Sequence, residues 1–322
     1  MRYVRAGVVV LGLFALACED GTSPTSETTG LEGAGPAPEL SEQGQGGEDR
    51  YGGNRRGRVY GVDAESYLVL FSLDRPGEIK RRVRISGTGG EKVVGIDFRP
   101  SAVAPADPAN IGKLYGITKT TIYQIDPRTG AASNGQPLTV PLKGAFFGTG
   151  FNPVVDRWRN HGVTEQNLRL NVDLGLTISD TSLAYEPGDR NFGKDPSVAG
   201  TAYTNSDNDP ATGTTLYAID AKHDVLVVLN VPNNGKLTTV GRLRVRTNKF
   251  VGFDIPGELQ TGKRFGYASL TTPDDRHDKW YWGGSRGRGG STLYKVDLDT
   301  GAARRVGAIG NRSPLVSIAL AP

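Results

Sequence analysis

Two aspartates occupy the same position in two copies of a recurring glycine-led segment. Asp97 and Asp254 are each the third residue of such a segment, and the matching residues in three other copies are Gly150, Ala202 and Ala319. If the copies surround one axis, both carboxylates face one channel, where they could bind a cation or act as a general acid and base. The alternative is a structural role, in which each carboxylate accepts hydrogen bonds from backbone amides and channel water.

A second group of chemically capable side chains falls in the longest segments expected between strands, 160–166, 186–197 and 272–291. Flat aromatic side chains can stack on sugar rings, and arginine can bind acidic groups through paired hydrogen bonds. These segments therefore predict a binding face, although the aromatic residues could instead pack between repeats or beneath the loops. The candidates on this face are His161, Asp189, Arg190, Trp280, Trp282 and Arg286.

The sequence offers little for a metal or cofactor. Asp207 and Asp209 lie in an oxygen-rich segment and are calcium candidates, but turns rich in Asn and Asp are common without metal. The three histidines are scattered, so the spacing typical of zinc sites is missing. Short matches to a serine-hydrolase elbow at 283–287 and to a phosphate loop at 257–264 lack a following helix. We therefore expect no cofactor.

Short strands must position all these side chains, because a motif of about fifty residues recurs along the chain. The glycine-led segments begin at residues 95, 148, 200 and 252, and a similar one begins at Ser317. Each copy alternates apolar and polar residues, as half-buried strands do. The segments 122–131 and 293–302 share a strand followed by an Asp-x-x-Thr-Gly turn, and 216–220 reads as a divergent third copy. Four strands in a repeat of this length are typical of propeller blades.

The fifth copy predicts how the ring closes. The last strand, 315–321, would be the innermost strand of a blade whose other strands are 58–63, 67–73 and 79–85. This exchange removes the open sheet edges that a linear array would leave. The predicted fold is therefore all-β, a propeller of five four-stranded blades over residues 53–322. An irregular pair of β-sandwiches and an open solenoid are the alternatives.

The N-terminal residues read as an export signal. Arg2 and Arg5 precede the apolar run 6–17, which as a helix reaches about 18 Å and is too short for a hydrocarbon core of about 30 Å. The run ends at Cys18, the only cysteine, and Phe-Ala-Leu-Ala-Cys resembles the bacterial lipobox. The resemblance implies cleavage before Cys18 and a lipid on its sulfur, and several acyl chains anchor a protein firmly. We expect residues 1–17 to be a lipoprotein signal peptide; the alternative is a plain secretory signal.

Residues 18–52 read as a disordered acidic tether. They are rich in Gly, Ser, Thr, Pro and Glu, and Leu31 and Leu40 are their only large aliphatic residues, so they cannot bury enough surface to fold. The segment 18–49 carries eight acids and no base, which leaves the body strongly basic within a chain of net charge +4. Outside the cytoplasm such a body favours an anionic glycan, lipid headgroups or lipopolysaccharide as partner rather than nucleic acid, although the charge could simply maintain solubility. An envelope protein is a further candidate partner.

Several of these segments together resemble the bacterial family called domain of unknown function 4394. The resemblance spans about residues 58–322, and its most specific block is Asn152-Pro153-Val154-Val155-Asp156-Arg157. It implies a secreted, propeller-like β-domain with no established activity. The family usually carries an acidic residue where Gly150 stands here. The other segments that carry the resemblance are 94–100, 114–117, 166–171, 202–205 and 215–220.

These observations predict an extracytoplasmic lipoprotein, anchored to a bacterial membrane through the Cys18 lipid and facing the periplasm or the cell surface. Its propeller would bind a partner or serve as a scaffold, and no residue can be assigned a catalytic role from the pattern alone. The alternative is a carbohydrate-active hydrolase that uses Asp97 and Asp254 as channel-lining carboxylates.

Overall fold

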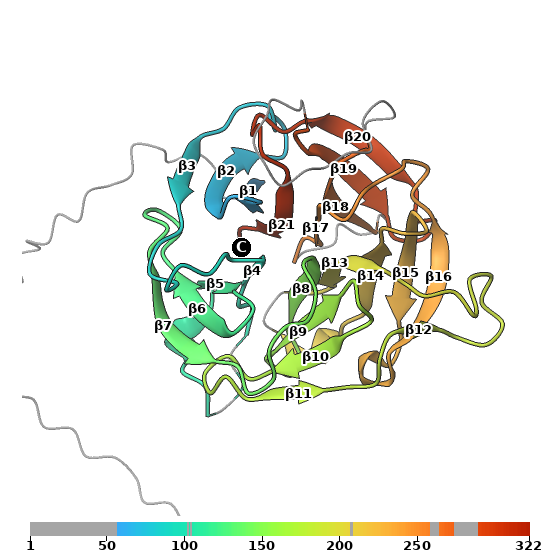
Figure 1. Ribbon diagram of the computed structural model, residues 1–322, viewed down its shortest axis with the longest axis horizontal. Coiled ribbons are helices and arrows are strands. Elements are labelled where there is room, and N and C mark those ends of the chain that lie inside the picture. Colours follow the sequence, from blue (N-terminus) through green and yellow to red (C-terminus); the bar gives the residue numbers. More distant parts are fainter. Residues whose placement is uncertain (1–56, 102, 104, 207–208, 258–263, 274–288) are drawn as a thin grey trace, which may run out of the picture. The chain divides into compact units, whose positions relative to one another are not determined.

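Each sequence repeat forms one antiparallel sheet, and five such sheets surround a central axis as the blades of a β-propeller (Figure 1). The computed structural model describes residues 57–322 except 102, 104, 207–208, 258–263 and 274–288. No α-helix occurs in this described part, so none there is long and apolar enough to cross a membrane. It contains three short 3-10 turns, η1 (Pro108–Asn110), η2 (Pro210–Thr212) and η3 (Pro232–Asn234).

The five sheets follow one another along the chain, which confirms the predicted fold. From the innermost strand outward, blade 1 consists of β21 (Leu315–Leu320), β1 (Arg58–Asp63), β2 (Tyr67–Ser72) and β3 (Arg81–Arg84). Blade 2 consists of β4 (Gly95–Phe98), β5 (Leu114–Ile117), β6 (Thr121–Ile125) and β7 (Ala132–Pro137). Blade 3 consists of β8 (Phe147–Asn152), β9 (Arg157–Gly162), β10 (Asn167–Leu170) and β11 (Thr177–Ser179).

Blade 4 departs from the four-strand pattern. It consists of β13 (Val198–Tyr203), β14 (Leu216–Asp220), β15 (Val225–Leu229) and β16 (Lys236–Arg242), with β12 (Ala184–Tyr185) added in parallel at its outer edge. The chain leaving blade 3 thus covers the free edge of blade 4 before entering it. Blade 5 consists of β17 (Val251–Asp254), β18 (Phe265–Leu270), β19 (Thr292–Asp297) and β20 (Ala303–Ala308).

One detail of the repeat was predicted wrongly. The segment 216–220 is β14, the second strand of its blade, whereas the two segments that it was matched with contain the third strands β6 and β19. The similarity is therefore one of strand composition and not of position in the blade.

The ring closes where the sequence predicts. The last strand, β21, pairs antiparallel with β1, and the register places Val59 opposite Leu320 and Gly61 opposite Ile318. The leading glycines let neighbouring inner strands approach closely. A Cβ at Gly148 would lie 2.6 Å from the backbone carbon of Gly200, and one at Gly252 would lie 2.6 Å from the backbone nitrogen of Ile318. The repeated glycine is thus a consequence of how tightly the strands crowd the axis.

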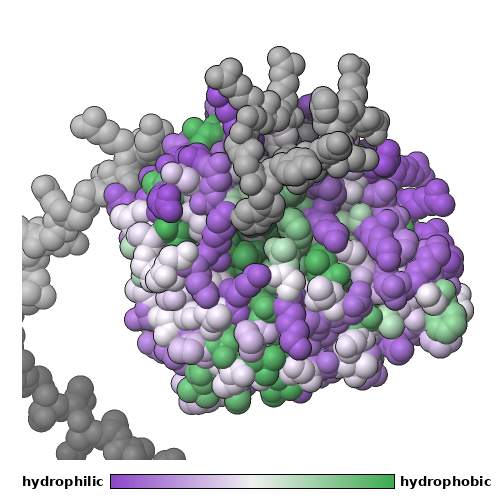
Figure 2. All heavy atoms as spheres, in the orientation of Figure 1, coloured by the Kyte–Doolittle hydropathy of each residue, from purple (hydrophilic) through white to green (hydrophobic). Residues whose placement is uncertain are grey.

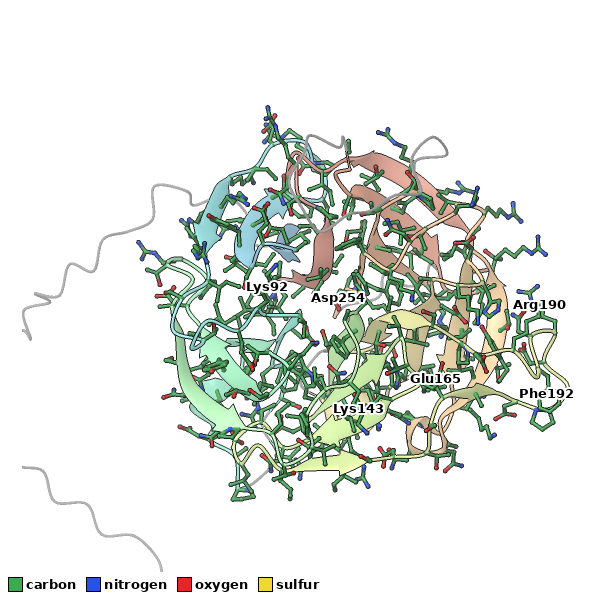
Figure 3. The ribbon with its side chains drawn as sticks, viewed as in Figure 1. Lys92, Lys143, Glu165, Arg190, Phe192 and Asp254 are labelled. Carbon is green, nitrogen blue, oxygen red and sulfur yellow. The ribbon has the colours of Figure 1, made fainter. Side chains whose placement is uncertain are left out.

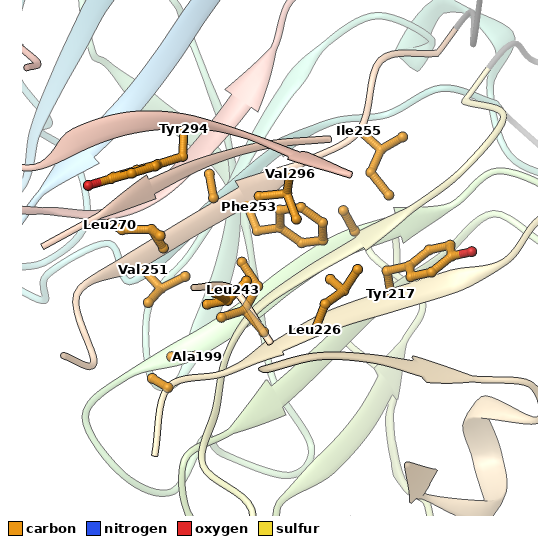
Figure 4. Packing of buried hydrophobic residues seen from close by; sticks show 14 of the residues in the cluster. Ala199, Tyr217, Leu226, Leu243, Val251, Phe253, Ile255, Leu270, Tyr294 and Val296 are labelled. Atoms are coloured by element: carbon orange, nitrogen blue, oxygen red, sulfur yellow. The ribbon is translucent and has the colours of Figure 1, made fainter. Parts of the chain in front are cut away.

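Apolar side chains fill the space between adjacent blades. Figure 4 shows the cluster between blades 4 and 5, where Phe253 of β17, Leu226 of β15 and Val296 of β19 meet. Leu243, which follows β16, is fully buried in the same cluster. This packing fixes the start of the segment that links blade 4 to blade 5, and that segment carries part of the candidate site.

Candidate functional site

The two channel aspartates lie on inner strands, as their places in the repeat predict. Asp97 is in β4 and Asp254 is in β17, and Figure 3 shows Asp254 near the centre of the ring. Asp97 accepts hydrogen bonds from the backbone N–H of Phe151, at 2.6 Å, and of Phe98, at 2.8 Å. Phe151 belongs to β8, the inner strand of the next blade. The carboxylate therefore caps a backbone amide on the channel-facing edge of its neighbour.

Asp254 makes the same arrangement on the other side of the ring. Its carboxylate accepts hydrogen bonds from the backbone N–H of Leu320 in β21, at 2.6 Å, and of Ile255, at 2.7 Å. Both aspartates keep a partly exposed surface, but the packed inner strands enclose their carboxyl groups. These contacts favour the structural role for the pair, since both oxygens of each carboxylate are already occupied.

The two carboxyl groups also share one electrostatic environment. Burial, and then repulsion from Asp254, raises the pKa of Asp97 well above its usual value. Burial raises the pKa of Asp254 to about 7, although its backbone hydrogen bonds act in the opposite direction. A Cβ at Gly150 would lie 3.7 Å from Oδ2 of Asp97, so an acidic residue at position 150 would add a third carboxyl group beside the pair.

His161 was predicted wrongly as a loop residue. It lies in β9 and is fully buried, and its Nδ1 is 2.9 Å from Oγ1 of Thr201 in the inner strand of blade 4. Burial, with the nearby Arg159 cation, lowers the pKa of His161 to about 3, so the ring is neutral. The strand continues to Gly162, two residues beyond the start of the expected loop, because His161 packs between blades.

Asp189 lies in the expected loop, between β12 and β13, but its carboxylate holds the loop in place. It accepts hydrogen bonds from the backbone N–H of Thr239 at 2.6 Å, from the Thr239 hydroxyl at 2.8 Å and from the backbone N–H of Asn191 at 2.8 Å. Burial alone would raise the pKa of Asp189, but these hydrogen bonds outweigh it and lower the pKa. Asp189 is thus a positioning residue for the neighbouring Arg190.

Several other predicted residues lie outside the described residues, namely Cys18, Asp207, Trp280, Trp282 and Arg286. Asp209 is described. Its carboxylate accepts a hydrogen bond from the backbone N–H of Ala211, at 2.9 Å, at the start of the short turn η2. Within the described ranges, no group of three or more His, Cys, Asp or Glu side chains is arranged to hold a metal ion.

Arg190 lines a cavity of about 480 Å³ at the end of blade 4, which we call the basic pocket. Three chain segments form it: the loop 186–197, the turn between β14 and β15, and the end of β16 with the residues that follow it. Among the described residues that line it, Asp224 is the only acidic one. Hydrophilic residues dominate the right-hand rim in Figure 2, where Figure 1 places blade 4. The Arg and Lys side chains in its wall are Arg190, Lys194, Arg242, Arg244 and Arg246.

Alternating burial explains why three of these arginines gather. Arg242, Arg244 and Arg246 are exposed. Leu243, which lies between the first two, and Thr247, which follows the last, are buried. The turn of blade 4 holds this segment, because Leu243 N–H donates to the Asp224 carbonyl at 2.9 Å and Thr247 N–H to the Asp224 carboxylate at 2.8 Å. We did not select these arginines from the sequence, although their Arg-x-Arg-x-Arg spacing was a usable signal.

Arg244 adopts an uncommon backbone conformation. Its φ is 61°, in the left-handed region that glycine accepts readily and arginine does not. Holding a non-glycine residue there costs on the order of 1 kcal/mol. Surrounding contacts must therefore impose this conformation, and it places the Arg244 side chain in the wall of the pocket.

A buried polar group supports the histidine in the pocket wall. His223 Nδ1 lies 2.9 Å from Oδ2 of the fully buried Asp220, and the Tyr185 hydroxyl donates to the same oxygen at 2.5 Å. Burial, with the Asp220 charge, raises the pKa of Tyr185, so its hydroxyl remains protonated. Asp220 also accepts from the backbone N–H of Lys222 at 2.8 Å. The histidine ring is therefore fixed through Nδ1, and Nε2 is its remaining nitrogen.

The Asn-Pro-Val-Val-Asp-Arg block has a structural explanation. Its Asp156 is buried and pairs with the fully buried Arg99 through two hydrogen bonds, at 2.8 and 2.6 Å. Asp173 accepts two more hydrogen bonds from the same guanidinium, both at 2.8 Å. This cluster joins blade 2 to blade 3, so the block specifies packing between blades.

Comparisons with known proteins give a family but no activity. No curated protein matches the chain. A structural genomics protein of unknown function from Bacteroides thetaiotaomicron is similar, with 14% sequence identity and a TM-score of 0.40. That match covers 57% of this chain and 45% of the other, which is less than half of its length. The family model described as a domain of unknown function, DUF4394, matches residues 67–319, so the chain belongs to this family.

Proposed function

We propose that this chain is an extracytoplasmic lipoprotein whose propeller binds an anionic glycan of the cell envelope through the basic pocket. One observation carries the proposal: five cationic side chains from two segments, the loop 186–197 and the stretch 242–246, surround one cavity, with Asp224 as the single acid among the described lining residues. Like charges held together raise the free energy of the empty pocket, and a bound anion lowers it. The lipid anchor at Cys18 and the tether 18–52 are proposed from the sequence alone.

The shape of the pocket favours a glycan over a protein partner. A volume of about 480 Å³ falls within the range of about 300–1,000 Å³ found for small-ligand sites. Phe192, in the same loop as Arg190, is 58% exposed, and Figure 3 shows both residues at the outer edge of the ring. An exposed aromatic face beside cationic groups suits a sugar ring that carries an acidic substituent.

The test measures binding of the full-length protein, purified in detergent, to immobilised dextran sulfate, polygalacturonate and neutral dextran. We expect the two anionic polymers to bind, the neutral polymer not to bind, and added salt to weaken binding. Replacing Arg242→Gln together with Arg244→Gly should weaken binding by about tenfold or more, because each charged hydrogen bond contributes roughly 1.5–3 kcal/mol. Glycine at 244 suits the positive φ there, so this change should not unfold the chain.

The matched control removes the same charge elsewhere. Arg304 and Arg305 are exposed on β20 of blade 5, and replacing both by Gln should leave binding nearly unchanged. Equal losses in the two double variants would mean that only net charge matters and would contradict the proposal. If no polymer binds but cross-linking in cells captures a protein through the pocket loop, the partner is an envelope protein instead.

A carbohydrate-active hydrolase is the second candidate. The observation in its favour is that the pKa values of Asp97 and Asp254 are both raised, because a general acid must hold a proton near neutral pH. The backbone hydrogen bonds to all four carboxylate oxygens argue for the structural role. Hydrolysis of a glycan by the wild type but not by an Asp97→Asn variant of equal thermal stability would establish the enzyme.

A further inference from the structure

We infer that the basic pocket selects a sugar-sized phosphate monoester, and that His223 determines this specificity. The inference rests on the proposed anion binding by the same pocket and names the chemical class of the ligand. It comes from two features of the described residues, the directions from which the cations approach the cavity and the buried support behind His223.

The cations approach the cavity from more than one side. Arg190 and Lys194 belong to the loop before β13, whereas Arg242 ends β16 and Arg244 and Arg246 follow it. A carboxylate has two oxygens in one plane and is satisfied by a single guanidinium fork. A phosphate monoester has three terminal oxygens in a tetrahedral arrangement and a charge of about −1.5 to −2 at neutral pH. Donors from separate segments therefore match phosphate better than carboxylate.

His223 adds a directed contact to this cationic wall. Asp220 accepts from Nδ1, and Tyr185 and the backbone N–H groups of Lys222 and His223 hold Asp220. Only 16% of the His223 side chain is exposed, and it lines the cavity. Because Nδ1 is occupied, Nε2 is the ring nitrogen that can contact a ligand, and the imidazolium form donates a hydrogen bond from it.

The remaining space fits a sugar. A phosphoryl group fills only part of about 480 Å³, and a second cavity of about 460 Å³ adjoins the pocket and shares Arg190 with it. The wall of this second cavity includes Glu186, Thr238 and Thr239, which offer hydrogen-bond acceptors and hydroxyl groups. Sugar hydroxyls need such neutral and acidic partners, whereas a bare phosphate does not.

The experiment is isothermal titration of the full-length protein in detergent with mannose 6-phosphate, inorganic phosphate, galactose 6-sulfate and galacturonate. We expect mannose 6-phosphate to bind about tenfold or more tightly than galacturonate, because its phosphate makes more charged contacts than a carboxylate does. It should also bind about tenfold or more tightly than inorganic phosphate, because its sugar makes additional contacts. Galactose 6-sulfate carries a single negative charge and should bind less tightly than mannose 6-phosphate.

Two variants separate ligand contact from folding. His223→Asn keeps an amide donor for Asp220 but has no group at the Nε2 position, so it should lose about tenfold in affinity for mannose 6-phosphate. Circular dichroism checks that this variant is folded. Lys222→Ala removes an exposed neighbouring cation that does not line the pocket and should change none of these values.

The outcomes distinguish this inference from the proposed function. If dextran sulfate binds through Arg242 and Arg244 but galacturonate binds as tightly as mannose 6-phosphate, the phosphate specificity is wrong and the anion site remains. Inorganic phosphate binding as tightly as the sugar phosphate would overturn the sugar-sized ligand. If no anion of either panel binds, both this inference and the proposed function are wrong.

Discussion

At the scale of single residues, the buried charges of this propeller join blades to one another. Arg99 is 1% exposed and pairs with the carboxylates of Asp156 and Asp173 at hydrogen-bond distance. Burying a charge without its partner is far more costly than burying a pair, because the remaining ion has lost its water and gained nothing. The most specific block of the family pattern is therefore explained by interblade packing.

This network predicts a large loss of stability when Arg99 is removed. Arg99→Ala should lower the free energy of unfolding by roughly 3–5 kcal/mol, because Asp156 is left buried and unpaired. Urea denaturation of the two proteins measures it. Arg82→Ala is the comparison. The Arg82 side chain, which pairs with Asp63, is 34% exposed, so this change should lower the free energy of unfolding by less than half as much. Equal losses of unfolding free energy in the two variants would contradict the idea that burial of the charges sets the cost.

The channel carboxyls predict how stability changes with pH. Asp254 has a pKa of about 7 in the folded protein, against an ordinary value of 3.8. A carboxyl whose pKa is raised by folding holds its proton more tightly when folded, so it contributes stability at low pH and loses it as pH rises from about 4 to about 7. The stability difference between wild type and Asp254→Asn should therefore shrink, or change sign, over that range.

Asp297 provides a comparison of opposite sign. Burial would raise its pKa, but the backbone N–H groups of Thr300 and Asp299 outweigh it and lower the pKa. Such a group contributes stability above its unfolded pKa and loses it in acid. The difference between wild type and Asp297→Asn should therefore grow as the pH rises through about 4. Parallel pH profiles for the two variants would contradict both assignments.

At the scale of strands, the glycine-led motif sets how closely the inner strands approach each other. A Cβ at Gly148 would lie 2.3 Å from the Thr201 hydroxyl and 2.6 Å from backbone carbon of Gly200. Gly148→Val should therefore destabilise the protein by roughly 1–3 kcal/mol or more, because the backbone of blade 4 cannot move aside easily. Thermal unfolding checks this against Gly77→Ala, where the nearest atom would be at an ordinary 3.7 Å. Similar melting temperatures for both variants would refute the crowding.

The strand scale also shows what the sequence can predict. The glycine-led segments recur at a nearly constant spacing, so blade number and closure by β21 followed from the pattern. The two-residue strand β12 did not, because Ala184 and Tyr185 are too few to show a period, and their pairing with β16 depends on tertiary contact. His161 was misassigned because a buried histidine, paired with Thr201 of another blade, is indistinguishable in sequence from a loop histidine.

The same limit applies to the candidate site. Arg190 was selected because its loop is long, whereas Arg242, Arg244 and Arg246 lie outside the long segments 160–166, 186–197 and 272–291. Only the packing of Leu243 into the core between blades 4 and 5 turns that segment toward the loop. Likewise, Asp220 and His223 are three residues apart in one turn, and nothing near them in sequence indicates Tyr185.

At the scale of the whole molecule, the proposed role depends on where the propeller is held. The N-terminal segment predicts cleavage before Cys18 and acylation of its sulfur, and several acyl chains bind a membrane at about 0.8 kcal/mol per buried CH₂. Cys18→Ser removes the only cysteine of the chain and leaves the propeller residues unchanged. A propeller on a lipid anchor would present its basic pocket to envelope glycans, whereas a released one would diffuse away from them.

Expression in a bacterium supplied with radiolabelled palmitate tests the anchor. The wild type should carry the label and sediment with membranes, whereas Cys18→Ser should carry none and appear in the soluble extracytoplasmic fraction. Arg242→Gln is the control, since it lies in the pocket and should keep both label and membrane location. A wild type without label but still exported would mean a plain secretory signal, and the pocket would then act on soluble anions. Because the described residues that line the pocket all belong to the propeller, purified Cys18→Ser should bind dextran sulfate as tightly as the wild type does.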